Sequence, residues 1–457
     1  MPILKLQQYI DTKQPIFMAG IGGISMSALA ELLVSRGAVV TGSDRSRTEI
    51  TAKLEALGIR IHYAHKAEHV TDAALVIRTA AIPDSNPEIQ AARTAGVPVM
   101  ERAQAWGEIM LEYDNVVCVA GTHGKTTTTS MISLAAMEAQ ADPTIMVGSV
   151  FPAIGGTLRI GANRYFIAES CEYCNSFLNF HPTIAVILNI EADHLDFFRD
   201  IHDIISSVRE FCRKTPEDRG VLIVNGDDAN AMAAVQETGR RVITFGTTDT
   251  QDVYPQNTSI KNGYYSFDVM YKGSLYTSVT LSVPGCHNML NALACCAVSI
   301  FSGFDAAAVS AGLQAFQGSG RRFQLTGHFH GATIVDDYAH HPSEMTATLK
   351  AARQMGFRRI FCIFQPHTYT RTHALFDDFI AALKLCDYAV LVDIYAAREK
   401  NTIGISSKHL ADKIDHAVYC PSLEAAASYV KSYAGEGDLI LTMGAGDVYK
   451  VGGMLAE

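Results

Sequence analysis

The feature that most constrains the fold is an alternation of short apolar segments with longer alanine-rich ones. Apolar, β-branched runs include PIFMAG, NVVCVAG, TIAVILNI, GVLIVNG and YAVLVDIY, and segments with helical periodicity such as SMSALAELLVSRG and TTTTSMISLAAMEAQ separate them. Strands that are apolar along their whole length are buried on both faces, which is typical of parallel sheets covered by helices. The pattern therefore predicts an α/β fold with mostly parallel sheets.

The alternation falls into three series, which predict three domains over residues 1–108, 109–318 and 319–457. The first series ends near Trp106 in a helical connector. The second runs to about Gly318 and includes a β-rich stretch, GYYSFDVMYKGSLYTSVTLSVPG. A chain of 457 residues is long enough for two to four domains of ordinary size.

Composition excludes several classes of function. The formal net charge of −10 argues against nucleic acid or an anionic membrane as the main partner. No apolar run approaches the roughly 20 residues that span a bilayer, and the N-terminal residues have no apolar core of a secretory signal. Ten cysteines scattered through the chain fit a reducing compartment better than a disulfide framework. We therefore expect a cytoplasmic protein.

The stretch GTHGKTTTTSM follows one predicted strand and begins a helix. At such a turn, backbone N–H groups and the positive end of the helix face an anion. Lys125 would reach the outer phosphates of a nucleotide, and the hydroxyl of Thr126 would hold Mg²⁺. The strict Walker pattern needs a glycine where this chain has Val119, so Gly121 gives a shorter loop. The order of strand, turn and helix still favours phosphate binding over an ordinary turn that happens to contain lysine.

The stretch GIGGIS, from Gly20 to Ser25, also follows a predicted strand and begins a helix. Asp44 follows the next strand at about the distance expected for an acid that contacts a ribose. Ser25 replaces the third glycine of the dinucleotide fingerprint, so the motif is weak and also fits tight packing of a helix on a strand. A nucleotide diphosphate is the predicted ligand. A nicotinamide dehydrogenase is less favoured because a separate P-loop is present.

Acids and a histidine follow two later strands. Glu169 comes just after the strand expected at RYFIA, and His194 lies in the sequence EADHLD that follows TIAVILNI. Because ligands of open parallel sheets bind at the carboxyl ends of the strands, Glu169 and His194 are expected to meet at the phosphates. A carboxylate suits Mg²⁺. Imidazole is an unusual ligand for this ion, so a structural role for His194 stays an alternative.

Polar clusters mark the ends of further elements. Asn288 and Asn291 lie on one face of the helix expected at HNMLNALACC. Arg321 and Arg322 lie at the expected hinge before the third domain, where an arginine could neutralise a transferred phosphoryl group. Two more clusters follow strands: Asp336, Asp337, His340 and His341 in IVDDYAHHPSE, and His367 and Arg371 in FQPHTYTRT. Each cluster alone is more typical of a solvated loop, but together they favour a site.

In this order, and over nearly the whole chain, the motifs resemble the Mur ligase family, the ATP-dependent enzymes that form the amide bonds of peptidoglycan precursors. The resemblance lies in GIGGISMSALAE, GTHGKTTTTSM, NIEADHLD, HNMLNALA, GSGRRF, VDDYAHHP, FQPHTYTRT, DIYAAREK and GAGDVYK. The GTHGKT loop marks the family. The His-Pro after Asp-Asp-Tyr and the FQPHTYTRT string favour the members that add L-alanine.

The resemblance implies a Rossmann-like N-terminal domain that binds a UDP-sugar, a central P-loop-type ATPase domain, and a Rossmann-like C-terminal domain that closes and admits the amino acid. The implied reaction joins L-alanine to UDP-N-acetylmuramate through an acyl phosphate, using ATP and Mg²⁺. It would be a cytoplasmic step of bacterial cell wall synthesis, on which cell shape and division depend. The implied partners are these small molecules, without nucleic acid or membrane, in a monomer or homodimer.

Residue roles follow from the same resemblance. Catalytic roles would fall to Lys125, Glu169, His194 and Arg322. ATP would contact Gly121, Thr122, His123, Gly124, Lys125, Thr126, Thr127, Asn288, Asn291, Arg322 and Asp337. The UDP-sugar would contact Gly20, Gly22, Gly23, Ser25 and Asp44. Thr126, Glu169 and His194 would hold the metal, and His340, His367 and Arg371 would lie near the amino acid.

The sequence departs from the family pattern in two places. Cys171 and Cys174 stand where acids are frequent, although Glu169 and Glu172 are kept. The carbamylated lysine of several relatives has no convincing equivalent in SSVREFCRK. Two other functions stay open: a ligase of the same family that adds another amino acid or a recycled tripeptide, and an NAD(P)-dependent oxidoreductase built on GIGGIS.

Overall fold

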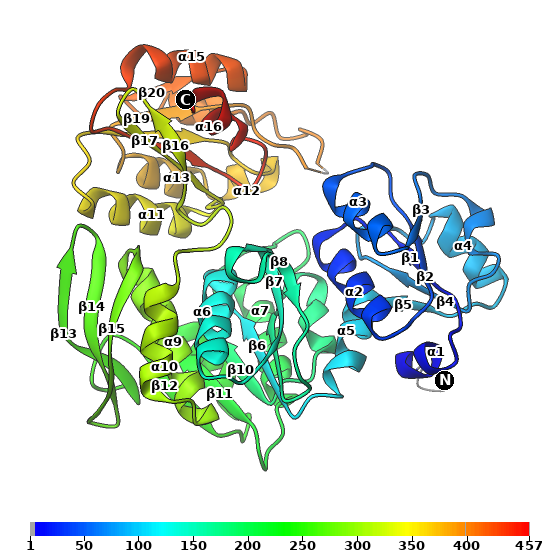
Figure 1. Cartoon of the computed structure of the whole chain (residues 1–457). Coiled ribbons are helices and arrows are strands. Elements are labelled where there is room, and N and C mark those ends of the chain that lie inside the picture. Colours follow the sequence, from blue (N-terminus) through cyan, green and yellow to red (C-terminus); the bar gives the residue numbers. More distant parts are fainter. Residues whose placement is uncertain (1–4, 398, 457) are drawn as a thin grey trace. The chain divides into compact units, whose positions relative to one another are not determined.

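The computed structural model describes residues 5–397 and 399–456, in which helices and strands alternate along the chain (Figure 1). The chain divides into two compact units, which are described separately. The first comprises Met1–Tyr254, Tyr271–Gly273 and Leu293–Gly312, and the second comprises Pro255–Met270, Ser274–Ala292 and Leu313–Glu457. Within the described residues, every helix is too short or too polar to cross a membrane.

The first unit begins with five parallel strands in the order β3-β2-β1-β4-β5. These are β1 Ile16–Ala19, β2 Val40–Ser43, β3 Arg60–His62, β4 Leu75–Arg78 and β5 Val99–Glu101. The helices around them are α1 Leu6–Asp11, α2 Ile24–Ser35, α3 Glu49–Ala56, η1 Ala67–Val70, α4 Pro87–Thr94 and α5 Arg102–Met110. The strand order reverses between β1 and β4, so the glycine turn after β1 lies at the switch point where such sheets bind ligands.

Alternation along β1 explains why helices cover both faces of this sheet. Ile16 and Met18 belong to the core that includes residues of α2 and α5. Phe17 and Ala19 belong to a separate core with residues of η1 and α4. Successive side chains of a strand point to opposite faces, so a wholly apolar strand needs a cover on each side.

The rest of the first unit holds the strand order β12-β11-β10-β6-β9-β7-β8, parallel except for β7 with β8. The strands are β6 Asn115–Ala120, β7 Thr144–Phe151, β8 Gly156–Arg159, β9 Tyr165–Glu169, β10 Ile184–Ile187, β11 Val221–Asn225 and β12 Val242–Phe245. The helices are α6 Lys125–Glu138, η2 Pro152–Ile154, η3 Tyr173–Asn179, α7 Ile201–Arg213 and α8 Ala229–Val235, with α9 Cys286–Ser302 and α10 Ala306–Ala315 shared between the units. The central β6 places its glycine turn beside the ends of β9 and β10.

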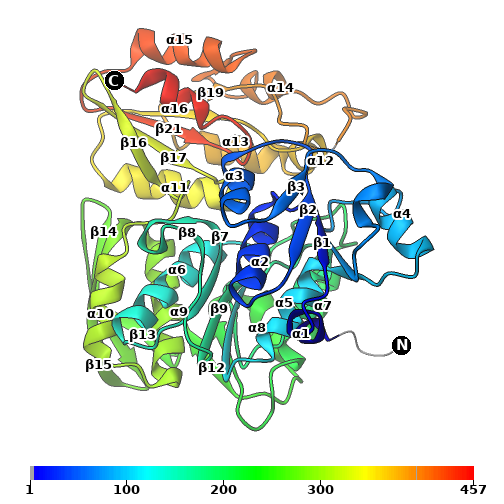
Figure 2. The same ribbon diagram turned by 45° about the vertical axis from the view of Figure 1, so that its right-hand side comes forward.

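The second unit contains the β-rich stretch, in the order β15-β14-β13, and a six-stranded sheet in the order β16-β17-β21-β18-β19-β20 (Figure 2). The strands are β13 Val253–Lys261, β14 Tyr264–Tyr271, β15 Ser274–Pro284, β16 Gln324–Phe329, β17 Ala332–Asp337, β18 Ile360–Phe364, β19 Tyr388–Leu391, β20 Ala417–Tyr419 and β21 Leu439–Met443. The helices are α11 Pro342–Gln354, α12 Tyr369–Ala374, α13 Phe376–Leu383, α14 Ser407–Ala411, α15 Leu423–Tyr433 and α16 Lys450–Leu455. The six-stranded sheet is parallel except for β16, and separate cores lie on its two faces. The predicted α/β class is confirmed.

Candidate active site

The GTHGKT sequence forms a tight turn between β6 and α6. Gly121 and Gly124 have φ angles of 143° and 84°, which L side chains rarely adopt. Gly124 is the N-cap of α6, and no side chain among the described residues caps it. The first N–H groups of a 14-residue helix are thus left facing outward from the turn, the arrangement that binds phosphate.

The segment after β10 braces this turn. The Thr122 N–H donates to the backbone oxygen of Asn189 at 3.0 Å, and the His123 N–H donates to the Asn189 side-chain oxygen at 2.7 Å. The Glu191 N–H donates to the hydroxyl of Thr122 at 2.9 Å. These bonds fix the backbone of the turn without using its helix-terminal N–H groups.

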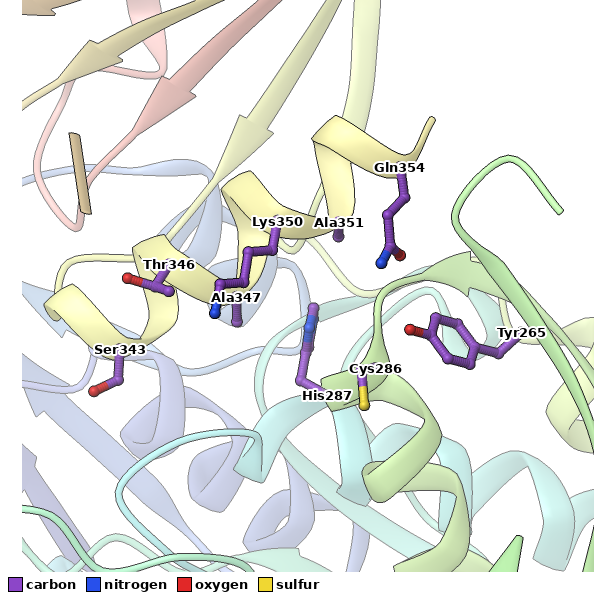
Figure 3. Close-up of a pocket in the computed structure, with 9 residues that line it drawn as sticks. All are labelled: Tyr265, Cys286, His287, Ser343, Thr346, Ala347, Lys350, Ala351 and Gln354. Carbon is purple, nitrogen blue, oxygen red and sulfur yellow. The ribbon is translucent and has the colours of Figure 1, made fainter. Parts of the chain in front are cut away.

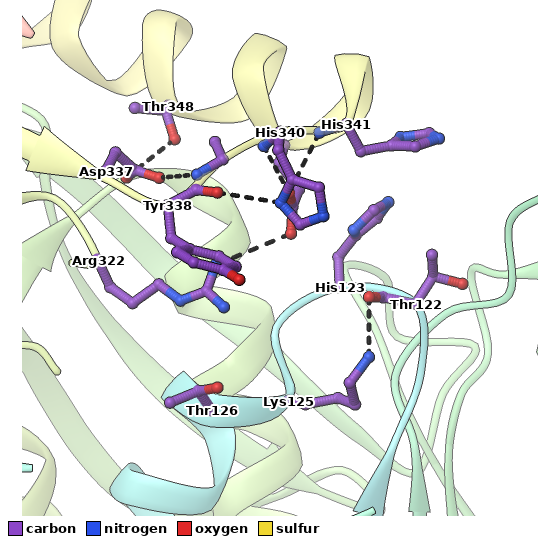
Figure 4. Close-up of polar contacts among 12 residues, drawn as sticks. Thr122, His123, Lys125, Thr126, Arg322, Asp337, Tyr338, His340, His341 and Thr348 are labelled. Atoms are coloured by element: carbon purple, nitrogen blue, oxygen red, sulfur yellow. Dashed lines mark hydrogen bonds and ion pairs between the residues drawn. The ribbon is translucent and has the colours of Figure 1, made fainter. Parts of the chain in front are cut away.

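Lys125 is the first residue of α6, and its ammonium group folds over the turn. It donates to the backbone oxygens of Gly121 at 2.6 Å and Thr122 at 3.0 Å, the latter drawn in Figure 4. Its Nζ also lies 3.3 Å from Oε2 of Glu172. Burial alone would lower the pKa of Lys125, but the nearby charge of Glu172 outweighs it and raises the pKa. The lysine is therefore a fixed positive charge at the turn.

Thr126 and Glu169 meet beside the lysine. The Thr126 hydroxyl donates to Oε2 of Glu169 at 2.7 Å, and the Gly148 N–H donates to the same oxygen at 2.9 Å. A Cβ on residue 148 would lie 2.5 Å from that oxygen, so a side chain there would displace the Glu169 carboxylate from this position. Thr127, next along α6, is 9% exposed. A hydroxyl and a carboxylate at one point are the oxygen ligands that Mg²⁺ prefers, so these residues fit the predicted metal.

Glu172 occupies a central position that the sequence analysis did not assign to it. Its side chain is 7% exposed and lies between Lys125 and His194, whose Nε2 is 3.9 Å from Oε1 of the glutamate. His194 also packs against Tyr173, with ring centroids 4.7 Å apart. Across residues 5–397 and 399–456, no hydrogen bond or ion pair joins His194 to Glu169. The two predicted metal ligands therefore have different neighbours: Glu169 contacts Thr126, and His194 lies beside Glu172.

The first glycine turn is built differently. The Gly22 N–H donates to Oδ2 of Asp44 at 2.9 Å, so the acid predicted to contact a ribose also closes the turn. Gly20 has a φ of 76°, and Gly23 is the N-cap of α2 without a side-chain cap in the described structure. The hydroxyl of Ser25 accepts from the indole N–H of Trp106 at 3.1 Å. The backbone of the turn, rather than the Ser25 hydroxyl, is thus available to a diphosphate.

In the second unit, Arg322 precedes β16 and Asp337 ends β17, and the two side chains have different surroundings (Figure 4). The Asp337 carboxylate accepts from the N–H groups of Phe323 at 3.0 Å and Ala339 at 2.8 Å, and from the Thr348 hydroxyl at 3.3 Å. Burial raises its pKa to about 6.

Arg322 is held less tightly than its neighbour. Its guanidinium lies 3.9 Å from Glu344 and over the ring of Tyr338. Arg321 instead donates to Asp336 at 2.8 Å and to the backbone oxygen of Gly444 at 2.7 Å. Because Arg321 makes these structural contacts, Arg322 is the better candidate to bind an anion.

The three residues predicted to lie near the amino acid come together in the second unit. The rings of His340 and His367 are 5.8 Å apart, and His367 stacks on Tyr395 at 5.7 Å. Arg371 lies 3.3 Å from Nδ1 of His367. A cation and imidazole rings at the ends of β17 and β18 suit a small zwitterion.

Asn288 and Asn291 form a hydrogen-bonded pair at the start of α9. Asn291 donates to the Asn288 side-chain oxygen at 3.2 Å, and Asn288 donates to the backbone oxygen of Pro284 at 2.7 Å. Both side chains are buried. Part of their hydrogen-bonding capacity therefore serves the helix end rather than a ligand.

The adjacent His287 lines a pocket of about 280 Å³ (Figure 3). Tyr265 and Cys286 also line it, together with Ser343, Thr346, Ala347, Lys350, Ala351 and Gln354 from one face of α11. Burial lowers the pKa of His287 to about 4, so its imidazole is neutral at pH 7 and offers one donor and one acceptor. Such a pocket suits a polar heterocycle.

Comparison with known proteins places this α/β structure among the ligases that join amino acids to carboxylates. Family models described as the Mur ligase family catalytic domain, the Mur ligase middle domain and the Mur ligase glutamate ligase domain match residues 15–114, 119–299 and 321–446. The chain belongs to the Mur ligase family.

Individual relatives agree with this assignment. The UDP-N-acetylmuramate–L-alanine ligase of Acetivibrio thermocellus is 48% identical, covering 97% of this chain and 95% of that protein. The crystal structure of the UDP-N-acetylmuramate–alanine ligase of Thermotoga maritima matches with a TM-score of 0.81 at 30% identity, over 96% of this chain and 98% of the other. A murein peptide ligase from Psychrobacter arcticus shares the fold, with a TM-score of 0.72 at 24% identity over 97% and 98% of the two chains.

The predicted three-domain α/β fold and the resemblance to the family are confirmed by these matches. The boundaries at 108 and 318 and the roles of individual residues stay predictions. Sequence reasoning missed Glu172 and Trp106 as parts of the two turns. The position of Glu172 three residues after Glu169, at the end of a strand beside the P-loop, was the available signal.

Proposed function

We propose that the chain catalyses the ATP-dependent ligation of L-alanine to UDP-N-acetylmuramate, a step of bacterial cell wall synthesis. The names of its near relatives support the substrates, and the family supports the use of ATP. The observation that carries the proposed chemistry is the convergence of Lys125, Thr126, Glu169 and Glu172 at the start of α6. A positive charge, a hydroxyl and two carboxylates at a helix N-terminus are the groups that phosphoryl transfer requires.

The reaction needs an activated carboxyl group, because a free carboxylate would have to expel an oxide ion. An oxygen of the muramate carboxylate attacks the γ-phosphorus of ATP, the bond to the β–γ bridging oxygen breaks, and ADP leaves. The amine of alanine then attacks the acyl phosphate, inorganic phosphate leaves and the amine loses a proton. Catalysis of such a sequence is chiefly positioning and neutralisation of charge.

Each residue at the second turn has a proposed part in this sequence. The N–H groups at the start of α6 bind the phosphates, and Lys125 follows charge on the outer ones as the β–γ bond breaks. Glu172 keeps Lys125 charged and in place. Thr126 and Glu169 would hold Mg²⁺, which would supply positive charge to the reacting phosphates. His194, beside Glu172, would serve a second ion, and Arg322 the transferred phosphoryl group.

The first turn is proposed to hold the diphosphate of the UDP-sugar through the backbone of Gly20–Gly23 and the start of α2, with Asp44 at the ribose. Asn288, Asn291 and Asp337 stay proposed contacts of ATP, and the pocket beside His287 is proposed for the base. His340, His367 and Arg371 are proposed for alanine. A cytoplasmic location also stays a proposal.

The experiment that tests this function is release of phosphate and formation of the amide, measured with UDP-N-acetylmuramate, ATP and a panel of amino acids and muramyl-type tripeptides. We expect turnover with L-alanine to exceed that with every other amine. Preference for a tripeptide would move the chain to the recycling function. Oxidation of NADH or NADPH, followed at 340 nm with the same substrates, would instead support the oxidoreductase alternative.

A further inference from the structure

A carboxylate is completely buried at the edge of the five-stranded sheet. Glu88, the second residue of α4, is 0% exposed and accepts three side-chain hydrogen bonds. The donors are the Ser43 hydroxyl at 2.7 Å, Nδ1 of His65 at 2.8 Å and Nδ1 of His69 at 3.0 Å. A buried carboxylate destabilises the fold by several kcal/mol unless charged or hydrogen-bonding partners surround it. The three donors are therefore needed to keep this carboxylate in the interior.

The partners of Glu88 come from separate segments of the sheet edge. Ser43 is the last residue of β2, His65 follows β3, and His69 lies in η1. His62 stacks on His69 with ring centroids 4.0 Å apart and planes within 13°. The pKa of His62 is lowered by burial, and further by the neighbouring His69 and Arg60. The ring of His62 therefore covers the His69 side of these residues. We call Ser43, His65, His69 and Glu88 the Glu88 cluster.

A peptide bond and one hydrogen bond connect this cluster to the first glycine turn. Asp44 directly follows Ser43, and its Oδ2 accepts the Gly22 N–H at 2.9 Å while its Oδ1 accepts the Arg45 N–H at 2.7 Å. A Cβ on residue 22 would lie 2.8 Å from Oδ2, so the Asp44 carboxylate packs directly against the backbone of the turn. The direction of the Asp44 side chain thus depends on the backbone at Ser43, which Glu88 holds.

We propose that the Glu88 cluster positions Asp44 and the first glycine turn for the nucleotide of the UDP-sugar. This inference rests on the proposed function. Through the Ser43 hydroxyl, Glu88 fixes the end of β2. Asp44 then keeps Gly22 in the phosphate-binding conformation and directs its remaining lone pairs to the ribose. The histidines supply two of the hydrogen bonds that hold the Glu88 carboxyl group inside the domain. Glu88 is a positioning residue, with no contact to the reacting atoms.

The sharpest variant is Ser43→Ala, which removes the connection to β2 and leaves Glu88 with both histidines. Calorimetry should give a dissociation constant for UDP-N-acetylmuramate raised about tenfold, while the KM for ATP and kcat at saturating sugar stay within about twofold. A structural role alone would lower the melting temperature without this selective change. Equal affinity in Ser43→Ala and the wild type, with UDP-N-acetylmuramate bound by both, would overturn the inference.

Two further variants keep the test decisive. His69→Asn places an amide N–H where Nδ1 of the histidine lies, so affinity should stay near the wild-type value, whereas His69→Leu removes the donor and should weaken binding. If both bind equally well, the cluster does not position the turn. Glu68→Gln is the matched control, because Glu68 is exposed and pairs with Lys66 only at 3.5 Å. Failure of the wild type to bind the UDP-sugar would instead refute the proposed function.

Discussion

The first unit contains two glycine turns that each join a parallel strand to a helix. Each follows a parallel strand, and each begins a helix whose N-cap is a glycine without a side-chain cap among the described residues, Gly23 before α2 and Gly124 before α6. Because the first N–H groups of a helix lack partners within it, both turns present donors and a positive dipole to an anion. The N-cap conformations differ, extended at Gly23 and left-handed at Gly124, but the uncapped helix start is common to both turns.

The side chains around the two turns differ in charge and in the groups they contact. The first turn has an acid, Asp44, on a backbone N–H, and a serine hydroxyl that is occupied by Trp106. The second has Lys125 over its carbonyl oxygens and two carboxylates, Glu169 and Glu172, within hydrogen-bonding or ion-pair reach of its helix. A backbone cradle is sufficient for a diphosphate whose charge stays constant. Charge that moves during a reaction requires a lysine and a metal site.

Removing the lysine should have the largest effect. We expect Lys125→Ala to lower kcat at saturating ATP by about 1,000-fold or more, because no other group at the turn can follow charge on the outer phosphates. UDP-N-acetylmuramate should still bind, since the first turn is unchanged. Steady-state kinetics and calorimetry measure the two properties, and Lys53→Ala, on the surface beside Glu31, is the control. Activity within about tenfold of the wild type would remove the distinction between the turns.

Glu169→Gln should have the next largest effect. The amide can still accept the Gly148 N–H through its oxygen, so the melting temperature should change little. It is a poor ligand for Mg²⁺, so kcat should fall by about 100-fold and the Mg²⁺ concentration for half-maximal activity should rise. His194→Ala should act in the same way more weakly. Glu217→Gln, an exposed acid of the same unit, is the control. A lower melting temperature with an unchanged Mg²⁺ profile would make Glu169 structural.

The binding of ATP should depend on pH in a way that the binding of UDP-N-acetylmuramate does not. Burial raises the pKa of Asp337 to about 6, so this predicted ATP contact loses its charge as the pH falls below that value. If ATP binds only the ionised form, its KM at pH 5.5 should be about four times that at pH 8. Asp337→Asn should remove this dependence. The affinity for UDP-N-acetylmuramate, measured at both pH values, should not follow the same curve.

The same carboxyl group gives a stability prediction of definite sign. Its pKa is about 6 in the folded protein and about 3.9 in an unfolded chain. Between these values the folded protein binds the proton and the unfolded chain does not, so the contribution of Asp337 to the free energy of unfolding is complete below the unfolded pKa and declines as the pH rises towards the folded one. Denaturant titrations of the wild type and Asp337→Asn across this range should show their difference changing in that direction.

The sequence predicts the backbone of both turns because each depends on neighbours in the chain. Apolar runs predict buried strands, glycines permit the positive φ angles, and the helical pattern that follows supplies the N–H groups. The contacts that distinguish the turns are harder to predict from the sequence, because they join residues far apart in the chain. Glu172 reaches Lys125 across 47 residues of sequence, so no local pattern brings the two side chains together. Trp106 and Glu88 reach their partners across 81 and 45 residues.

The smallest expected effect concerns Ser25, the residue in place of the third glycine. Its hydroxyl accepts from Trp106 at 3.1 Å and lies 3.9 Å from the sulfur of Met146, so it faces the central part of the first unit. Ser25→Ala should therefore leave the affinity for UDP-N-acetylmuramate within about twofold. It should lower the free energy of unfolding by about 1 kcal/mol, because the buried indole N–H keeps only a 3.3 Å bond to the Ser25 backbone. Calorimetry and denaturant unfolding measure the two effects. A tenfold loss of affinity at unchanged stability would place the hydroxyl on the diphosphate, and the first turn would then depend on a side chain as the second one does.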